Sequence, residues 1–415
     1  MTAAAYPALL WLTVTAALLG ALQFGWHLGL LNTPLPFVGD DLGFDATSGA
    51  AAVVVSSLLI GASIGSLTAG QLADVLGPGQ ALLLNNISLI LGALLSLSTP
   101  GGFWGMLAGR FFSGIGAGAA SLYVPRFIAE TSPKLIRGQL CTLNQVFVTI
   151  GILLAYAAGW PYAQGTAKHV QVLGHAVAWW RIMCAMGLIP AAVQMLGMSL
   201  VPESPVWLQW KGHTDKAVTA EKQLLGDRWH QEGDLVRGSD ADGATEQLLA
   251  DAERQGGGDS DRKAGWGALL EKRYRRIMVL AACLPLLQQG SGINTVILYS
   301  SQVFAMAGLS SPVIGSIIVG LIQVVATLAA AALMDRAGRR LLLLISHLGM
   351  GACLFILAAA FLLPGLRGAA GNIAFGAVLG FVVFYSLGSA FVWSCVVETK
   401  QQSLSEITKL LQGEN

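Results

Sequence analysis

Charged side chains are scarce in this chain of 415 residues. Only 11% of the residues are Asp, Glu, Lys or Arg, whereas 54% are hydrophobic. Soluble globular domains carry about 25% charged residues, so the composition excludes that class. The net charge of +1 says nothing about partners, and we expect no nucleic acid among them.

Cysteines are also few, and their pattern excludes a disulfide framework. The five lie in or beside apolar segments, at positions 141, 184, 283, 353 and 395. An odd number without regular spacing is typical of small buried hydrophobic residues. The start of the chain lacks a basic or Ser/Arg-rich presequence. We therefore expect no cleavable signal or transit peptide, and we predict that the first apolar segment is an uncleaved signal anchor.

Long apolar runs, by contrast, are abundant. A helix needs about 20 predominantly apolar residues to cross a bilayer, and ten segments qualify. They are residues 9–31, 51–73, 80–99, 103–125, 139–160, 179–201, 277–305, 312–334, 341–363 and 371–396. The sequence therefore predicts an all-α, multi-pass membrane protein with about ten transmembrane helices. Gly114, Gly116 and Gly118 favour close helix packing over a dinucleotide site, because no strand surrounds them.

Basic residues collect on one side of the predicted membrane. Of the 24 Lys and Arg residues, 20 fall on that side when the ten segments alternate in direction. The loop after the first segment, on the opposite side, carries Asp40, Asp41 and Asp45 and no basic residue. The positive-inside rule then places both termini and the long loop 202–276 in the cytoplasm.

This long loop divides the chain into three predicted parts. They are a six-helix bundle at 1–201, a cytoplasmic loop at 202–276, and a shortened bundle with a cytoplasmic tail at 277–415. Within the loop we expect short helices at 215–225 and 244–254 and a disordered stretch at 226–264, which is poor in aromatic residues. The loop has no core for a catalytic domain, and we find no nucleophile–base pair, so we expect no enzyme activity, cofactor or metal.

Several short motifs follow these segments. In chain order they are Pro125, Glu130, Pro133, Arg137 and Gly138 in P-x-x-x-x-E-x-x-P-x-x-x-R-G; Pro202-Glu203-Ser204-Pro205; QQGSGIN at 288–294 with Tyr299; DRAGRR at 335–340; and Glu398-Thr399-Lys400. Together they resemble the sugar porters of the major facilitator superfamily. The segments 24–32 and 143–145 look closest to the plastidic glucose transporters. The resemblance implies a major facilitator fold that carries hexose, with glucose-like sugars favoured, by alternating access across the bilayer.

The chain departs from this family in two respects. The first loop between repeats reads Gly77-Pro78-Gly79-Gln80 where the family has G-R-R, and Val206 and Val397 replace an arginine and a proline. In addition, 129 residues separate Asp74 from Glu203, whereas 63 separate their counterparts Asp335 and Glu398. The difference of 66 residues corresponds to two helices missing from the usual twelve. The last segment therefore reads as a fusion of the tenth and twelfth spans.

Amide side chains in apolar segments are the predicted sugar ligands. Gln288, Gln289 and Asn294 flank a glycine-rich break, where amides can donate to and accept from sugar hydroxyls. The resemblance implies the same role for Gln145 and for Gln323, which stands where relatives place an asparagine. The alternative is that these amides only form interhelical hydrogen bonds.

Charged residues of both signs recur at the cytoplasmic helix ends of the two halves. The resemblance implies that they form an ion-pair gate between the halves. They are Glu130, Arg137 and Glu203 in the first half and Asp335, Arg336, Arg339, Arg340 and Glu398 in the second. The alternative is that they only reflect the positive-inside rule.

His27 occupies the position at which proton-coupled sugar porters carry an aspartate. No Asp or Glu lies deep inside any predicted segment, and proton relays in transporters usually need such carboxylates. We therefore expect a uniporter, although a histidine can also titrate near neutral pH.

Three other functions stay open at this stage: a proton-coupled symporter, a transporter-like sugar sensor, and an inactive product of mis-splicing. Sequencing the transcript across Gly388–Val397 would test the last of these. We expect a monomer in a lipid bilayer. The sequence does not distinguish the plastid envelope from the plasma membrane.

Overall fold

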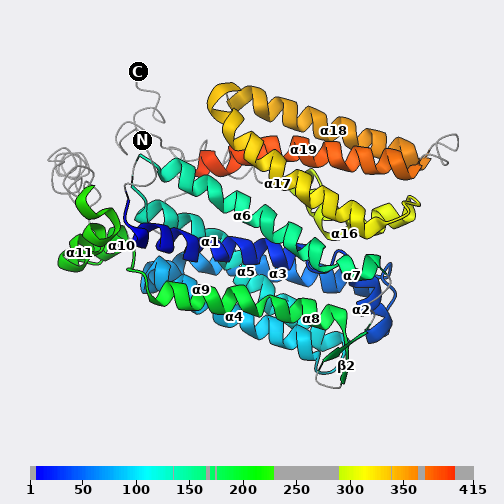
Figure 1. Cartoon of the computed structure of the whole chain (residues 1–415), viewed down its shortest axis with the longest axis horizontal. Coiled ribbons are helices and arrows are strands. Elements are labelled where there is room, and N and C mark those ends of the chain that lie inside the picture. Colours follow the sequence, from blue (N-terminus) through cyan, green and yellow to red (C-terminus); the bar gives the residue numbers. More distant parts are fainter. Residues whose placement is uncertain are drawn as a thin grey trace, which may run out of the picture.

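A computed structural model describes residues 6–133, 135–164, 169–172, 175–228, 289–337, 339–362 and 370–397. Two groups of long helices lie side by side in it (Figure 1). The first group contains α1 (Ala8–Gly29), α3 (Gly49–Leu76), α4 (Pro78–Ser98), α5 (Phe103–Thr131), α6 (Arg137–Ala158), and α8 (Trp179–Met186) followed by α9 (Leu188–Ser199). The second group contains α16 (Ile293–Met306), α17 (Pro312–Ala337), α18 (Arg339–Leu362) and α19 (Ala370–Val397).

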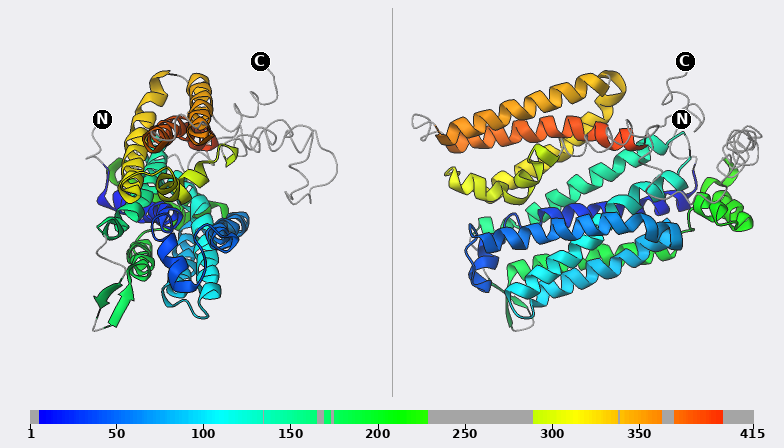
Figure 2. Two further views of the ribbon diagram at one scale, coloured as in Figure 1. Left: turned by 90° about the vertical axis from the view of Figure 1, so that its right-hand side faces the viewer. Right: turned by 180° about the vertical axis from the view of Figure 1, so that it is seen from behind.

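Short elements mark the two ends of the bundle. One end carries α2 (Leu35–Leu42), α7 (Trp160–Ala163) and an antiparallel hairpin of β1 (His169–Val172) and β2 (His175–Ala178). The other end carries α10 (Pro205–Trp210), α11 (Thr214–Leu225) and one 3-10 turn, η2 (Gly226–Arg228). We call these the outer and the inner end, following the predicted orientation (Figure 2).

The described helices confirm the predicted fold class. Eight candidate membrane spans are long and apolar enough to cross a bilayer. The two other predicted segments correspond to α5, which has 29 residues, and to α16, whose described part has 14. All ten predicted segments are thus helical in their described parts. The predicted loop helix at 215–225 is confirmed as α11. The first three residues of the stretch 226–264, which was expected to be disordered, form the 3-10 turn η2. The rest of that stretch, with the predicted helix at 244–254, lies outside the described residues.

Glycines allow α3 and α5 to pack with their backbones almost in contact. A Cβ atom added at Gly114 would collide with the carbonyl of Leu58, and one added at Gly118 would collide with the carbonyl of Ala62. Gly116 faces another neighbour, because its added Cβ would meet the Leu89 side chain of α4 at 2.6 Å. The predicted packing role of these glycines is confirmed.

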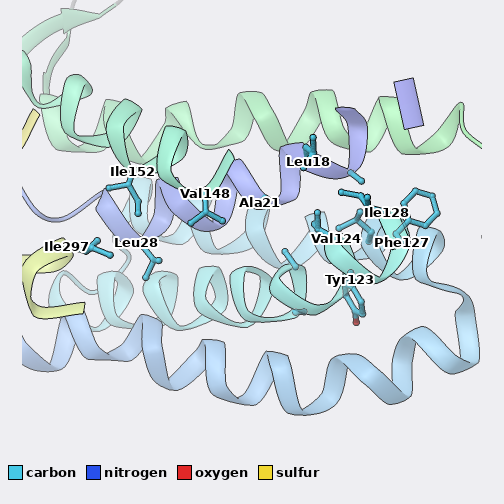
Figure 3. Packing of buried hydrophobic residues seen from close by; sticks show 14 of the residues in the cluster. Leu18, Ala21, Leu28, Tyr123, Val124, Phe127, Ile128, Val148, Ile152 and Ile297 are labelled. Carbon is cyan, nitrogen blue, oxygen red and sulfur yellow. The ribbon is translucent and has the colours of Figure 1, made fainter. Parts of the chain in front are cut away.

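A hydrophobic core extends from the first group of helices into the second. Leu28 of α1 and Ile152 of α6 lie close to Ile297 of α16 at one end of the view in Figure 3. Tyr123 and Phe127 of α5 lie toward its other end. The two groups therefore share buried apolar surface near the outer end.

Three buried amides connect α1, α4 and α9 inside the first group. Gln23 Nε2 donates to Gln194 Oε1 at 2.7 Å and lies 3.4 Å from Asn86 Oδ1. Gln194 Nε2 donates to the backbone oxygen of Ala16 at 3.2 Å. All three amides are fully buried. Because unpaired amides in hydrocarbon are costly, this amide triad fixes the three helices relative to one another.

Candidate functional site

Two of the predicted sugar ligands lie on helices that face each other across the two groups. Gln145 is on α6 and Gln323 is on α17, and both side chains are buried, with 8% and 2% exposed. The two helices approach closely about one turn from Gln323 and about three turns from Gln145, where a Cβ added at Gly320 would lie 3.1 Å from the Tyr156 ring. Each group thus carries one of the predicted sugar ligands in a buried position.

The predicted helix break in the glycine-rich motif is confirmed. Gly292 has φ of 83°, a left-handed conformation that favours glycine, and α16 begins immediately after it. Asn294 Nδ2 donates to Gln289 Oε1 at 2.7 Å, so these two amides are paired across the break. Gln288 lies outside the described residues. The role of all five amides as sugar ligands stays a prediction.

A cluster of hydrogen bonds at the outer end joins the two groups. Asn32 is fully buried just after α1, and its Nδ2 donates to the backbone oxygen of Ile297 at 2.7 Å and to Ser300 Oγ at 2.9 Å. Tyr156 of α6 donates to the same Ile297 oxygen at 2.7 Å. Ser301 approaches Asn32 twice, through its hydroxyl and, at 3.4 Å, through its backbone N–H. We call Asn32, Tyr156, Ile297, Ser300 and Ser301 the outer clamp.

The outer clamp adds hydrogen bonds from the opposite group to the backbone of α16. In a regular helix the Ile297 oxygen accepts from the N–H of Ser301, four residues later. Here that oxygen also accepts from Asn32 and Tyr156, and the Ser301 N–H lies 3.4 Å from Asn32 Oδ1. This part of α16 is therefore held by the opposite group of helices as well as by its own backbone.

At the inner end, Glu130 belongs to a network within the first half. Arg126 Nε lies 2.8 Å from Glu130 Oε1, and Arg126 NH1 lies 2.8 Å from Asp74 Oδ1. Ser204 donates its hydroxyl proton to Glu130 Oε2 at 2.5 Å. These contacts connect the ends of α3 and α5 to the segment that precedes α10.

Glu203 closes the first turn of α4. Its Oε1 accepts from the backbone N–H of Gly79 at 2.8 Å, and its Oε2 accepts from that of Gln80 at 2.9 Å. A helix N-terminus leaves such N–H groups unpaired and favours a negative charge. The Gly-Pro-Gly-Gln loop thus supplies backbone donors to Glu203.

Burial raises the pKa of Glu203, and hydrogen bonds from the backbone of Ser204, Gly79 and Gln80 oppose the rise. A raised pKa means that folding favours the protonated carboxyl. The stability contributed by Glu203 is therefore fully present below the ordinary carboxyl pKa and is lost as the pH rises through the raised value.

A side chain at Gly77 would disturb the contact between Glu203 and the start of α4. It has φ of 97°, and an added Cβ would lie 2.7 Å from Glu203 Oε2. We expect Gly77→Ala to lower the free energy of unfolding by about 1–3 kcal/mol, through backbone strain and the displaced carboxylate. Thermal unfolding of the purified protein measures this. Gly70→Ala is the matched control because it lies inside α3 with open space around it; equal melting temperatures for the two variants would contradict the prediction.

The structure describes only some of the remaining residues of the predicted gate. Arg137 donates from Nε and NH2 to the backbone oxygen of Ser132, at 3.4 and 3.3 Å, again within the first half. The side chains of Asp335, Arg336, Arg339 and Arg340, and the whole of Glu398, lie outside the described part of the chain. An ion-pair gate between the halves therefore stays a prediction.

His27 is buried in α1, with 2% of its surface exposed. Its backbone oxygen accepts a hydrogen bond from Arg110 NH2 of α5 at 2.9 Å. The described residues include no partner for either ring nitrogen of His27. The predicted coupling position thus lies beside a buried arginine.

The chain is similar to known transporters over almost its full length. The family model described as "Sugar (and other) transporter" matches residues 12–411. Plastidic glucose transporter 4 of Arabidopsis thaliana is 38% identical over 376 residues, which cover 91% of this chain and 64% of that protein. The facilitated glucose transporter member 4 of solute carrier family 2 from Homo sapiens is 31% identical, over 94% of this chain and 76% of that protein.

Solved structures show the same fold. The E. coli xylose transporter XylE in a partially occluded inward-open conformation matches 98% of this chain and 90% of that chain, with 25% identity and a TM-score of 0.72. The proton:xylose symporter XylE bound to 6-bromo-6-deoxy-D-glucose matches 94% and 82%, with 25% identity and a TM-score of 0.73. This protein is an integral membrane protein of the sugar transporter family in the major facilitator superfamily.

Proposed function

We propose that this protein carries hexoses, glucose-like sugars foremost, across a membrane by facilitated diffusion. The observation that carries the proposal is the pair of buried amides, Gln145 and Gln323, on facing helices of the two groups. Amides both donate to and accept from hydroxyls, so a sugar between α6 and α17 can bond to both groups at once. Gln289, Asn294 and Gln288 extend the same proposed site along the break before α16.

Alternating access needs two gates that open in turn. The outer clamp joins the two groups at one end through Asn32 and Tyr156. We assign it as the outer gate in its closed state. The charged residues from Glu130 to Glu398 are the proposed inner gate, which would form when the outer clamp opens.

The matched relatives include a plastidic glucose transporter, and we propose the plastid envelope as the membrane. We also propose that the protein acts as a monomer. It consists of two bundles, 1–201 and 277–415, joined by the loop 202–276.

His27 favours a uniporter over a proton symporter. One matched relative is named a facilitated glucose transporter and one matched structure a proton:xylose symporter, so the family contains both types. The transmembrane segments of this sequence carry no Asp or Glu at depth. Without a carboxylate to load and release a proton, sugar movement follows only its own gradient.

Purified protein in proteoliposomes tests this proposal. We expect D-glucose to enter until its inner and outer concentrations are equal, with L-glucose as the control sugar. An imposed pH gradient is expected to leave the final level unchanged. A variant with a two-helix insert between Gly388 and Val396 is assayed in parallel with the unchanged protein. This variant tests the same proposal with a second half of the usual length. Accumulation of glucose above the outer concentration under a pH gradient would contradict the uniporter.

A further inference from the structure

Arg110 is a fully buried arginine without a counter-charge among the described residues. It lies in α5 with 0% of its surface exposed. NH2 donates to the backbone oxygen of His27, whereas Nε and NH1 have no partner in the described part of the chain. A guanidinium stays protonated in proteins, so this site holds a permanent positive charge. The ion pairs found between described residues, which involve Arg126, lie at the inner end.

Unpaired hydrogen-bond donors also lie on α1, at the residue that Arg110 contacts and at the one before it. His27 has two unpaired ring nitrogens, at least one of which carries a proton, and the indole N–H of Trp26 is also unpaired. This indole lies near the junction of α8 and α9, because a Cβ added at Gly187 would be 3.3 Å from Trp26 Nε1 and 3.4 Å from the Cys184 oxygen. Met106, one turn before Arg110 on α5, packs in the same hydrophobic cluster as Trp26 and Cys184.

The surroundings of this donor cluster are apolar. Met106, Trp180, Met183 and Cys184 are at most 2% exposed and pack in one hydrophobic cluster with Trp26. Asp41, a carboxylate at the same end of the bundle, accepts a hydrogen bond from Trp180 Nε1 at 2.7 Å. Burying an unpaired charge in such an environment costs several kcal/mol. A neutral acceptor would satisfy the N–H groups, but only an anion also balances the charge.

From this geometry we propose that a small monovalent anion, chloride under ordinary conditions, binds between Arg110 and His27 inside the first half. The anion accepts hydrogen bonds from Arg110 Nε and NH1 and from the His27 ring. It substitutes for a carboxylate on α1, whose place His27 takes. The bound anion stabilises the packing of α1 against α5 and α8. This role of the anion does not depend on which sugar the protein carries.

Thermal unfolding in matched salts tests this site. We expect the purified protein to melt about 3 °C higher in sodium chloride than in sodium gluconate at equal ionic strength. Arg110→Gln is expected to abolish the difference. Arg126→Gln is the matched control, because Arg126 is paired at the inner end and its loss is expected to leave the chloride effect intact. Equal melting temperatures in the two salts, or a chloride effect that persists in Arg110→Gln, would overturn the proposal.

A second measurement on the unchanged protein covers the case in which Arg110→Gln does not fold. Crystals soaked in sodium bromide are expected to show an anomalous scattering peak between the Arg110 guanidinium and the His27 ring. Bromide peaks at the protein surface alone would show that the buried donors bind no anion.

Discussion

Inserting the missing two-helix segment between Gly388 and Val396 is expected to raise glucose uptake by about tenfold or more, since a shift of ~1.4 kcal/mol between conformations changes a population tenfold. The described second half consists of α16 to α19, against six spans in the first half. The described residues of the second half include no counterpart of two spans of the usual twelve, and we expect this to remove part of the wall around the proposed sugar site and of the proposed inner gate. We expect the chain of 415 residues to favour the state with its outer clamp closed and to bring glucose to equal concentrations only slowly.

The insert needs a control for length. A flexible Gly/Ser linker of the same ~66 residues cannot span the bilayer, so this variant is expected to transport no faster than the unchanged chain. Initial uptake rates in proteoliposomes at equal protein density compare the three proteins. If the unchanged chain transports hexose as fast as the chain with the helical insert, the argument from the missing helices is wrong. Slow uptake by the unchanged chain alone would favour the inactive product among the alternatives.

Replacing Asn32 by leucine is expected to open the outer clamp. The substitution removes two hydrogen bonds donated to α16 and one accepted from it. Removing partners of buried polar groups costs about 1–3 kcal/mol, which corresponds to a shift of about 5- to 150-fold toward the open state. Hydrogen–deuterium exchange of the Ile293–Met306 backbone measures this, because exchange reports the fraction of time that a helix is open.

Two variants bracket this prediction. Tyr156→Phe removes one hydrogen bond to Ile297 without changing shape, so a smaller acceleration is expected. Thr13→Val removes a buried hydroxyl whose partner in the described part of the chain is the backbone oxygen of Leu9 in the same helix, and no acceleration of exchange in α16 is expected. Exchange in α16 that is as slow in Asn32→Leu as in Thr13→Val would show that the clamp does not hold the two groups together.

The helices and the break before α16 could be predicted because both are local properties of the sequence. Apolar runs of sufficient length identify membrane spans. Gly290-Ser291-Gly292 predicts a break in the helix regardless of which helices pack against it. The family resemblance rests on short motifs and is confirmed by a match over residues 12–411. These signals need no knowledge of which helices are neighbours.

The partners of polar residues could not be predicted in the same way. Asn32 follows an apolar run and looks like an ordinary loop residue, yet its partner Ile297 lies 265 positions away. Glu203 was expected to face charges of the other half, and in the described residues it accepts from backbone N–H groups of its own half. The sequence shows that a side chain is charged, whereas the groups that donate hydrogen bonds to it depend on the three-dimensional arrangement. A lone asparagine at the end of a span is the signal that could have indicated the clamp.

The amide triad has a consequence for how the protein is made. Gln23 and Gln194 are separated by 171 positions, so at ~5–20 residues per second α9 leaves the ribosome roughly 10 to 30 s after α1. Asn86 of α4 emerges earlier, 63 positions after Gln23. During this interval Gln23 lacks the partner of its shorter hydrogen bond, so we expect α1 and α4 to pack together before α9 joins them. The packing of these three helices is then complete only after the last of them has been synthesised.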